Sequence, residues 1–191
     1  TESPASHKGH IFAIDISSAS HESIGGRQYW LRVHDIFTDM KWSYFLNKKS
    51  ETSGKVRGLI KHLKNAEDVT VKTIRCDNAG ENKSLQNDCI KEGLGINFQF
   101  TAPYTPQHNG SIERSFATSY GRMRAMLNAS GIKGNLRQTL WAVAANFEND
   151  SDNIMVDRND EACAYEKFYG RMPGYSNFLQ GFGQIGIAKN G

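Results

Sequence analysis

The sequence contains few cysteines and lacks any long apolar segment. Its three cysteines are an odd number without Cys-x-x-Cys spacing, which favours a reducing compartment and argues against a cysteine-built zinc site. The apolar runs are too short to cross a bilayer, so no membrane partner is expected. No charged and then apolar leader opens the chain, which argues against secretion, and the missing initial methionine is typical of an excised or processed fragment. We therefore expect a soluble, intracellular protein.

The remaining composition is that of an ordinary globular domain. The 191 residues are 38% hydrophobic and 23% charged, and a chain of this length can bury roughly 70% of its unfolded surface. Residues 1–9 are rich in Ser, Pro and Gly, which predicts a disordered lead-in. The clearest patterns lie in residues 10–155, and residues 156–191 are expected to form an extension or a linker towards a further domain.

Charge is segregated along the chain, although the net charge is only +3. Residues 41–64 hold seven basic residues and one acid, residues 114–137 hold five basic residues and no acid, and residues 148–161 hold six acids and one base. One basic stretch alone is usually only a solvated face. Two of them flanking candidate acidic residues favour binding to a phosphate backbone.

The first half of the chain predicts an α/β domain. Short apolar and aromatic runs predict three strands in an antiparallel meander, followed by an amphipathic helix. If the next strand returns by a right-handed crossover, it lies parallel to the first strand. Asp15, near the carboxyl end of the first strand, and Asp77, directly after the returning strand, would then meet where open α/β sheets place ligands. The ranges are Ile11–Ile16, Gln28–Asp35 and Trp42–Leu46 for the meander, Glu51–Lys64 for the helix and Val69–Cys76 for the returning strand.

A proline-containing loop followed by a long helix dominates the second half. The two prolines of Thr101–Gly110 disfavour regular helix, and its final Asn-Gly pair permits a tight turn that would serve as a hinge. A 3.6-residue apolar pattern then predicts a helix from about Gly110 to Asn128, with Glu113 in its first turn. Other elements are expected as a turn at Asn78–Asn82, a helix at Lys83–Glu92, a strand at Asn97–Phe100, a helix in a core or dimer contact at Leu136–Phe147, and a short helix within Ala162–Gly170.

Taken singly, each candidate residue has an ordinary explanation. A lone Glu113 is typical of a first-turn acid stabilised by the helix dipole, and a lone Asp15 of a buried carboxylate held by backbone donors. His108 is typical of an incidental exposed histidine, and Asp35 of a turn cap. The joint placement of three acids favours metal coordination instead, because a buried unpaired charge is costly.

Two stretches around these acids carry a family resemblance. The order and spacing of Asp15, Asp77 and Glu113, with IRCDNAGEN around Asp77 and PYTPQHNGSIER around Glu113, closely resemble the catalytic core of integrases encoded by copia-type long-terminal-repeat retrotransposons. The similarity runs from about Phe12 to YEKFYGRMP at Tyr165–Pro173. It implies an α/β, RNase H-like fold, a five-stranded mixed β-sheet flanked by α-helices on both sides, with residues 10–155 as the catalytic core.

The resemblance also implies a function in DNA integration. The enzyme would be a Mg²⁺-dependent polynucleotidyl transferase that processes DNA 3′ ends and transfers element DNA strands into host DNA. Asp15, Asp77 and Glu113 would be both the catalytic and the metal-binding residues, with two Mg²⁺ ions per site and Mn²⁺ as a substitute. The partners would be double-stranded element and target DNA and further copies of the chain, in a homodimer or higher oligomer, within a virus-like particle and the nucleus.

DNA contacts cannot be copied from the retroviral relatives. Those proteins usually carry basic residues one and two turns beyond the glutamate, where this chain has Ala117 and Tyr120. The candidates in the loop and on the helix are Gln107, Asn109, Arg114, Tyr120 and Arg124.

Two other functions stay open at this stage. An RNase H-like nuclease would use similar carboxylates, but those families do not share the PYTPQHNG loop. A catalytically decayed element surviving as a DNA-binding or oligomerisation module is the second alternative, and the three intact acids argue against it.

Overall fold

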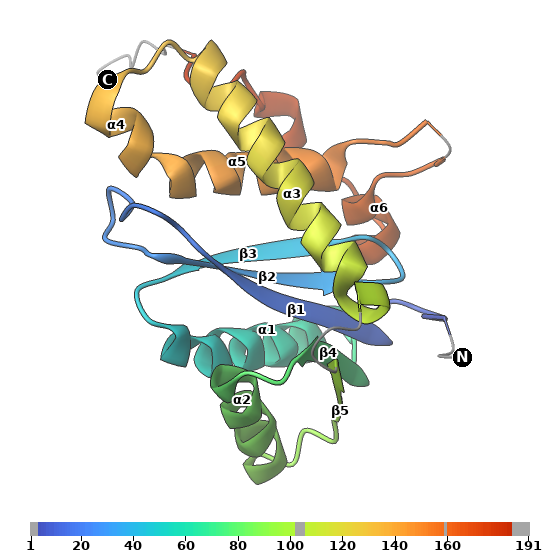
Figure 1. The fold of residues 1–191 in the computed structure, drawn as a ribbon. Coiled ribbons are helices and arrows are strands. Elements are labelled where there is room, and N and C mark those ends of the chain that lie inside the picture. The colour runs from blue at the N-terminus through green and yellow to red at the C-terminus, as the bar shows by residue number, and fades with distance from the viewer. Residues whose placement is uncertain (1–3, 102–105, 159, 185–191) are drawn as a thin grey trace, which may run out of the picture.

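The computed structural model describes residues 4–101, 106–158 and 160–184, and for residues 106–111 it describes the backbone alone. Its centre is a five-stranded mixed sheet in the order β3-β2-β1-β4-β5 (Figure 1). The first three strands form the predicted antiparallel meander, and the last two run parallel to β1. The strands are β1 (Ile11–Ser18), β2 (Tyr29–Asp35), β3 (Lys41–Leu46), β4 (Thr73–Asp77) and β5 (Asn97–Thr101).

Helices cover both faces of this sheet, which confirms the predicted fold class (Figure 1). One face carries α1 (Thr52–Glu67) and α2 (Gly80–Lys91), and the other carries α3 (Pro106–Ala129) and α5 (Trp141–Ile154). The shorter helices are η1 (Lys49–Glu51), α4 (Gly134–Thr139), α6 (Ala164–Tyr169) and η2 (Ser176–Phe178). Among the helices of the described residues, none has both the length and the apolar character that a membrane span requires.

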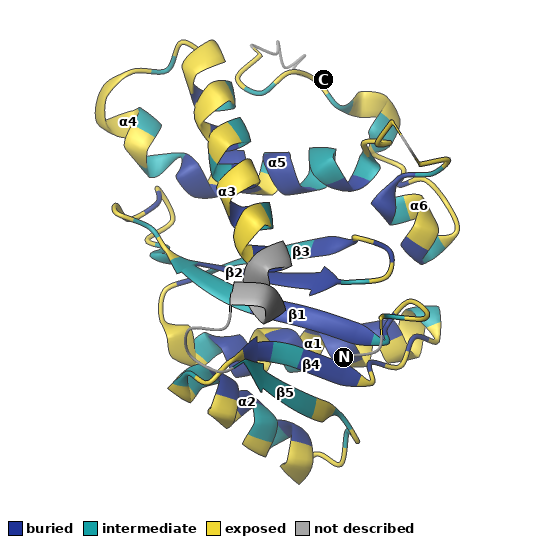
Figure 2. Ribbon diagram, turned by 45° about the vertical axis from the view of Figure 1, so that its right-hand side comes forward, coloured by how far each residue is buried: buried dark blue, intermediate teal, exposed yellow. Residues whose placement is uncertain are grey.

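The buried residues of β1 belong to two core layers, one on each face of the sheet, and the first half of the strand is coloured as buried (Figure 2). Phe12 and Ile14 lie in the apolar cluster beneath α1, whereas Ala13 lies in the cluster beneath α3 and α5. Successive strand residues point to opposite faces, so a central strand flanked by helices must be apolar on both. The apolar face predicted for α1 is buried as expected and consists of Val56, Leu59, Ile60 and Leu63.

The packed body extends on both sides of residues 10–155. The side chain of Phe168 on α6 is fully buried, and its ring packs edge-on against Trp42 with centroids 5.0 Å apart. Lys8 Nζ donates to the Phe168 carbonyl at 2.8 Å, and the Gly9 N–H donates to Asp35 at 2.9 Å. These contacts add both flanking segments to the core, while the limits of the functional domain stay a prediction.

The long helix begins earlier than the sequence predicted. α3 starts at Pro106, so the predictions of an irregular backbone through Gly110 and of Glu113 in the first turn are wrong. Proline is tolerated at the first helical position, because its missing N–H would have no partner there. Glu113 therefore lies about two turns inside the helix, where the dipole of the first turn no longer accounts for it. Residues 102–105 of the loop lie outside the described residues.

The helix predicted at Leu136–Phe147 is two helices. α4 ends at Thr139, and Leu140 between the helices has ψ of 4°, so α5 begins on a new axis at Trp141. This break turns two predicted packing residues outwards, and Leu136 and Val143 are about half exposed. The remaining boundary differences are small: β4 begins at Thr73 instead of Val69, and α2 begins at Gly80 instead of Lys83.

Candidate active site

Asp15 and Asp77 come together at the carboxyl end of two parallel strands. The ladder between β1 and β4 pairs Ala13 with Arg75. The same register continued by two residues sets Asp15 opposite Asp77, on strands whose spacing is about 4.8 Å. Asp15 shares its sheet face with Ala13, which packs beneath α3. The predicted meeting of the two aspartates is therefore a consequence of strand register.

The electrostatics of Asp15 bring the third acid into the same group. Burial raises the pKa of Asp15, and the negative charges of Asp77 and Glu113 raise it further. The Ile16 N–H, which donates to Asp15 Oδ1 at 2.8 Å, and the positive charge of Lys49 oppose that shift. The carboxylates of Asp77 on β4 and Glu113 on α3 thus both act on Asp15 of β1, as expected for acids near one site.

Asp77 is held by hydrogen bonds at the start of α2. Its Oδ1 accepts from the Ala79 N–H at 3.1 Å and from Asn82 Nδ2 at 2.6 Å, and Asn82 also donates to the Asp77 carbonyl. Asn82 is buried and donates from the first turns of the helix. NAGEN was predicted as a turn and belongs to the motif around Asp77, but the role of Asn82 was missed. The sequence offered only a local signal, an Asx-type residue followed five positions later by an asparagine in the next helix.

Glu113 is placed by the residues beside it on α3. The helix is anchored by the buried side chains of Ile112 and Phe116, whereas Glu113 itself is exposed. An apolar face held against the sheet leaves the next position along the helix at the rim of that contact. Glu113 therefore stands at the edge of the sheet towards Asp15, whose pKa it raises.

Arg32 on β2 connects the strand of Asp15 with the helix of Glu113. It lies directly opposite Asp15 in the antiparallel register and is fully buried. Its Nη1 donates to Ser115 Oγ on α3 at 2.7 Å, and its Nη2 lies 3.4 Å from Glu148 Oε2 on α5. Because Ser115 follows Glu113 by two positions, this buried side chain helps to fix the distance between two of the acids.

The three acids fit the chemistry of a divalent cation, although they do not stand in coordinating positions. Among the described residues, no three His, Cys, Asp or Glu side chains lie close enough together to hold a metal ion. Like charges repel, and Asp77 is turned towards Asn82 and Ala79. Carboxylates are nevertheless the ligands that Mg²⁺ prefers. The structure thus brings the predicted residues into mutual electrostatic range, and metal coordination by them stays a proposal.

The predicted DNA-contact residues are distributed over different surfaces. Tyr120 is half-buried against Trp30, and its hydroxyl lies 2.8 Å from Ser17 Oγ. Arg124 is exposed on the same side of α3, whereas Arg114 lines a groove on the other side. Gln107 and Asn109 belong to the helical backbone of α3, and their side chains, like that of His108, lie outside the description.

A groove of about 530 Å³ opens at the carboxyl end of β1, beginning two residues beyond Asp15. It is lined by residues 17–21 at the end of β1, the second half of α3, α4 and the beginning of α5. Ser17 lies two positions beyond Asp15 and shares its face of the strand. The groove therefore continues the sheet edge at which the acids lie.

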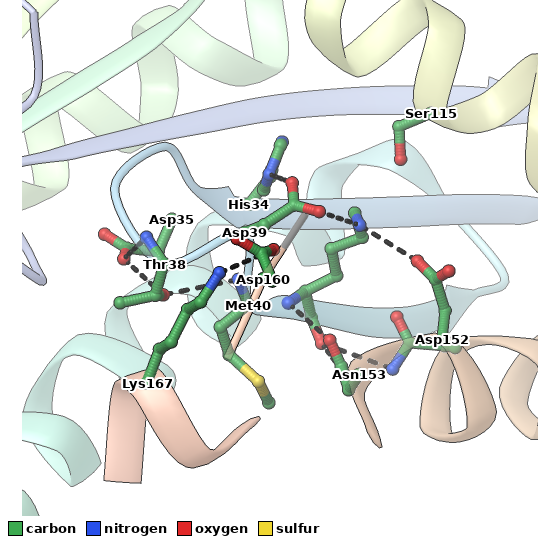
Figure 3. A network of polar contacts seen from close by, with 12 residues as sticks. His34, Asp35, Thr38, Asp39, Met40, Ser115, Asp152, Asn153, Asp160 and Lys167 are labelled. Carbon is green, nitrogen blue, oxygen red and sulfur yellow. Dashed lines mark hydrogen bonds and ion pairs between the residues drawn. The ribbon is translucent and has the colours of Figure 1, made fainter. Parts of the chain in front are cut away.

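A second charged cluster lies between α3, β3 and α5 (Figure 3). Lys41 Nζ lies 2.9 Å from carboxylate oxygens of both Asp39 and Asp152, and His34 Nε2 lies 2.5 Å from Asp39 Oδ1. Burial opposes the ionisation of Asp39, but hydrogen bonds from His34 and Lys41 outweigh it and hold the pKa of Asp39 well below its usual range. These charges compensate one another, so the cluster stabilises packing.

Asp35 caps the turn after β2, as the sequence predicted. Its Oδ2 accepts from the Thr38 N–H at 3.0 Å and from Thr38 Oγ1 at 2.6 Å, and its Oδ1 accepts from Gly9. Asp35 lies at the opposite end of β1 from Asp15, since it pairs with Phe12. It is therefore not a fourth acid of the site.

The strand order and the two helical layers define an RNase H-like fold. Solved structures share this fold. A simian T-cell lymphotropic virus intasome in complex with PP2A regulatory subunit B56 gamma matches 96% of this chain and 59% of its own, with a TM-score of 0.64 and 16% identity. The catalytic core domain of BIV integrase matches 84% of this chain and 93% of its own, with a TM-score of 0.60 and 16% identity.

Sequence comparison points to the same group of proteins. A retrovirus-related Pol polyprotein from transposon TNT 1-94 of Nicotiana tabacum is 29% identical over 123 residues, or 64% of this chain. One from transposon RE2 of Arabidopsis thaliana is 25% identical over 170 residues, or 88% of this chain. No family model matches the chain. The chain spans only 9% and 11% of the lengths of these two polyproteins.

The chain is thus similar in sequence to retrovirus-related Pol polyproteins of plant transposons, and it shares the fold of retroviral integrase catalytic cores. The resemblance to integrase cores of copia-type retrotransposons is therefore confirmed, both by the similar sequences and by the shared fold.

Proposed function

We propose that this chain is the catalytic core of a retrotransposon integrase, a polynucleotidyl transferase acting on double-stranded DNA. The observation that carries the proposal is the effect on Asp15 of two acids far from it in sequence, Asp77 and Glu113, whose charges raise the Asp15 pKa at the sheet edge. Relatives among transposon Pol polyproteins and the fold of an integrase core support it.

The three carboxylates would hold a pair of Mg²⁺ ions, or Mn²⁺ as a substitute. When bound, such ions neutralise charge on the attacking and leaving oxygens of a phosphodiester. The mutual repulsion that raises the pKa of Asp15 would then become attraction to the cations, because cations invert the local electrostatics. Asn82 would orient Asp77, and Arg32 would hold the helix of Glu113.

The proposed reactions require no protein nucleophile. In end processing, a water oxygen attacks phosphorus, the bond from phosphorus to the 3′ oxygen breaks, and a free 3′-hydroxyl remains on the element DNA. In strand transfer, that 3′-hydroxyl oxygen attacks a target phosphodiester in line, and the target 3′ oxygen leaves. The chain's residues position the phosphodiester and compensate its charge.

Partners and location are part of the same proposal. The chain would act on element ends and target DNA as a homodimer or higher oligomer, in a virus-like particle and the nucleus. The neighbour described as an intasome and the Pol relatives support this proposal.

A strand-joining assay tests the proposal. In Mg²⁺, the Asp77→Asn variant should lose joining activity by at least about 100-fold, because one metal ligand loses its charge. Its unfolding temperature and duplex affinity should stay close to those of the unsubstituted chain. Asp157→Asn is the matched control, since Asp157 is exposed and outside the site.

Retained joining by Asp77→Asn would contradict the proposal. Hydrolysis of RNA in a hybrid without joining would favour an RNase H-like nuclease, and DNA binding without any reaction would favour a decayed binding module.

A further inference from the structure

The groove beside the acids carries two arginines without acidic partners. Arg124 of α3 and Arg137 of α4 both line it, and its lining contains no Asp or Glu from the described part of the chain. Within the described residues neither arginine makes an ion pair, and Arg137 donates only to the side-chain oxygen of Asn128. The Arg137 Nε is buried without a hydrogen-bond partner. A partly desolvated guanidinium with free donors is poised to bind an anion.

A nearby arginine on the same helix does have acidic partners, so their lack is specific to the groove side of α3. Arg122 lies two positions before Arg124 but faces the other side of α3. There it pairs with Asp152 and lies 3.5 Å from Glu148 Oε1. One side of α3 is therefore neutralised by the acids of α5, and the side facing the groove is not.

The walls of the groove are tied together by hydrogen bonds. The connection between β1 and β2 contacts the α4–α5 region, since the Ile24 N–H donates to the Thr139 carbonyl at 2.8 Å and Trp141 Nε1 donates to the His21 carbonyl at 2.9 Å. On the opposite wall, Tyr120 contacts Ser17. The arginines thus project from a braced concave surface, which lowers the cost of ordering them on binding.

We propose that this groove binds the phosphate backbone of a DNA strand several nucleotides from the reacting phosphodiester, with Arg124 and Arg137 as the two contacts. The proposal rests on the proposed function, because the distance along the DNA is counted from the phosphodiester that would react at the three acids. Glu113 and Arg124 are about three helical turns apart on one side of α3, or roughly 16 Å. At about 3.4 Å per nucleotide along one strand, that distance corresponds to roughly five nucleotides.

Charge favours a nucleic acid over the other possible occupants. The groove is lined by three serine residues and two arginines but no acid, and it continues the edge that carries the proposed reaction site. An acidic segment of another protein or of a second copy of this chain could contact the same arginines. Such a segment would have no reason to lie at a fixed distance from Asp15, Asp77 and Glu113. The experiment below separates these occupants.

The first measurement is the salt dependence of binding to a fluorescent duplex of about 20 base pairs. Arg124→Ala and Arg137→Ala should each reduce the slope of log affinity against log salt by about 0.9. Raising the salt from about 50 to 200 mM should therefore weaken the binding of each variant by a factor about three- to fourfold smaller than the factor for the unsubstituted chain. Lys64→Ala, which removes one exposed charge from α1 on the other sheet face, should leave the slope unchanged.

The second measurement tests the register. A branched duplex that imitates the joined product would carry one uncharged methylphosphonate at successive positions from the joint. Neutralising a phosphate about five nucleotides away should weaken binding of the unsubstituted chain and not of Arg124→Ala, whose side chain sets this register. Thermal unfolding of Arg137→Ala and the charge-retaining variant Arg137→Lys show whether α4 keeps its structure. Arg124→Ala, at an exposed position on α3, tests the groove without changing α4.

Unchanged slopes in both arginine variants would overturn the inference while leaving strand joining, and hence the proposed function, intact. Changed slopes with no joining by the unsubstituted chain would instead contradict the proposed function and keep the groove as a phosphate site. Binding of polyglutamate that depends on Arg137, with no such dependence for DNA, would assign the groove to an acidic protein segment and overturn the inference.

Discussion

At Asp15, burial and the nearby charges of Asp77 and Glu113 act in the same direction, and both raise its pKa. The ionised form is therefore less favourable in the folded chain than in the unfolded chain. The free energy of unfolding should fall as pH rises from the ordinary value of 3.8 through the raised pKa. This cost at neutral pH is typical of a site whose charges are arranged for a ligand.

Asp15→Asn tests this statement at the residue scale. Without divalent cations at neutral pH, the variant should unfold a few degrees above the unsubstituted chain, because the neutral amide removes the charge penalty and still accepts from Ile16. The gain should disappear below the ordinary value of 3.8, where Asp15 is protonated in both states. Thermal unfolding against pH measures it, with Asp157→Asn as control. A gain that does not depend on pH would contradict the electrostatic explanation.

Element boundaries show what the sequence could and could not predict. The amphipathic face of α1 follows from a local pattern and the parallel pairing of β1 with β4 from a right-handed crossover, and both are found in the structure. The start of α3 at Pro106 was missed, because a proline at a first helical position looks the same in sequence as one in a loop. The break at Leu140 was missed because the apolar row continues across it. Asn82 was missed because its role depends on the tertiary position of Asp77.

Arg32 connects three elements and gives a prediction at this scale. It is buried between the rings of Trp30 and Phe116 and bonds to Ser115 on α3 and Glu148 on α5. Arg32→Met should lower the free energy of unfolding by about 3–5 kcal/mol, because it leaves the buried Glu148 carboxylate with only the part-exposed Arg122 as a nearby cation.

A double-mutant cycle in urea checks this prediction. Arg32→Met combined with Glu148→Leu should lower the free energy of unfolding by less than the sum of the single changes, since the double variant buries neither charge of the pair. Additive costs would show that the pair is not coupled and that Arg32 acts through packing alone.

At the scale of the whole molecule, the fold separates neutralised from free positive charge. The acidic run at residues 148–161 was predicted only as a separate stretch, but it pairs with Lys41, Arg122 and Lys167 on one side of α3. On the other side of α3, Arg124 and Arg137 make no ion pair with any residue that the structure describes. Sequence revealed the segregation, whereas the pairing depends on how α5 lies across β3 and α3 and could not be derived from it.

The central claim is that Asp15, Asp77 and Glu113 jointly bind divalent cations. The most direct measurement is the anomalous scattering of a crystal of this chain grown with Mn²⁺. We predict anomalous peaks between the three carboxylates, with oxygens of Asp15 and Asp77 within about 2.0–2.2 Å of the ion, near the Mg²⁺ ligand distance. Peaks located elsewhere, or the three carboxylates directed away from one another at saturating Mn²⁺, would contradict the account.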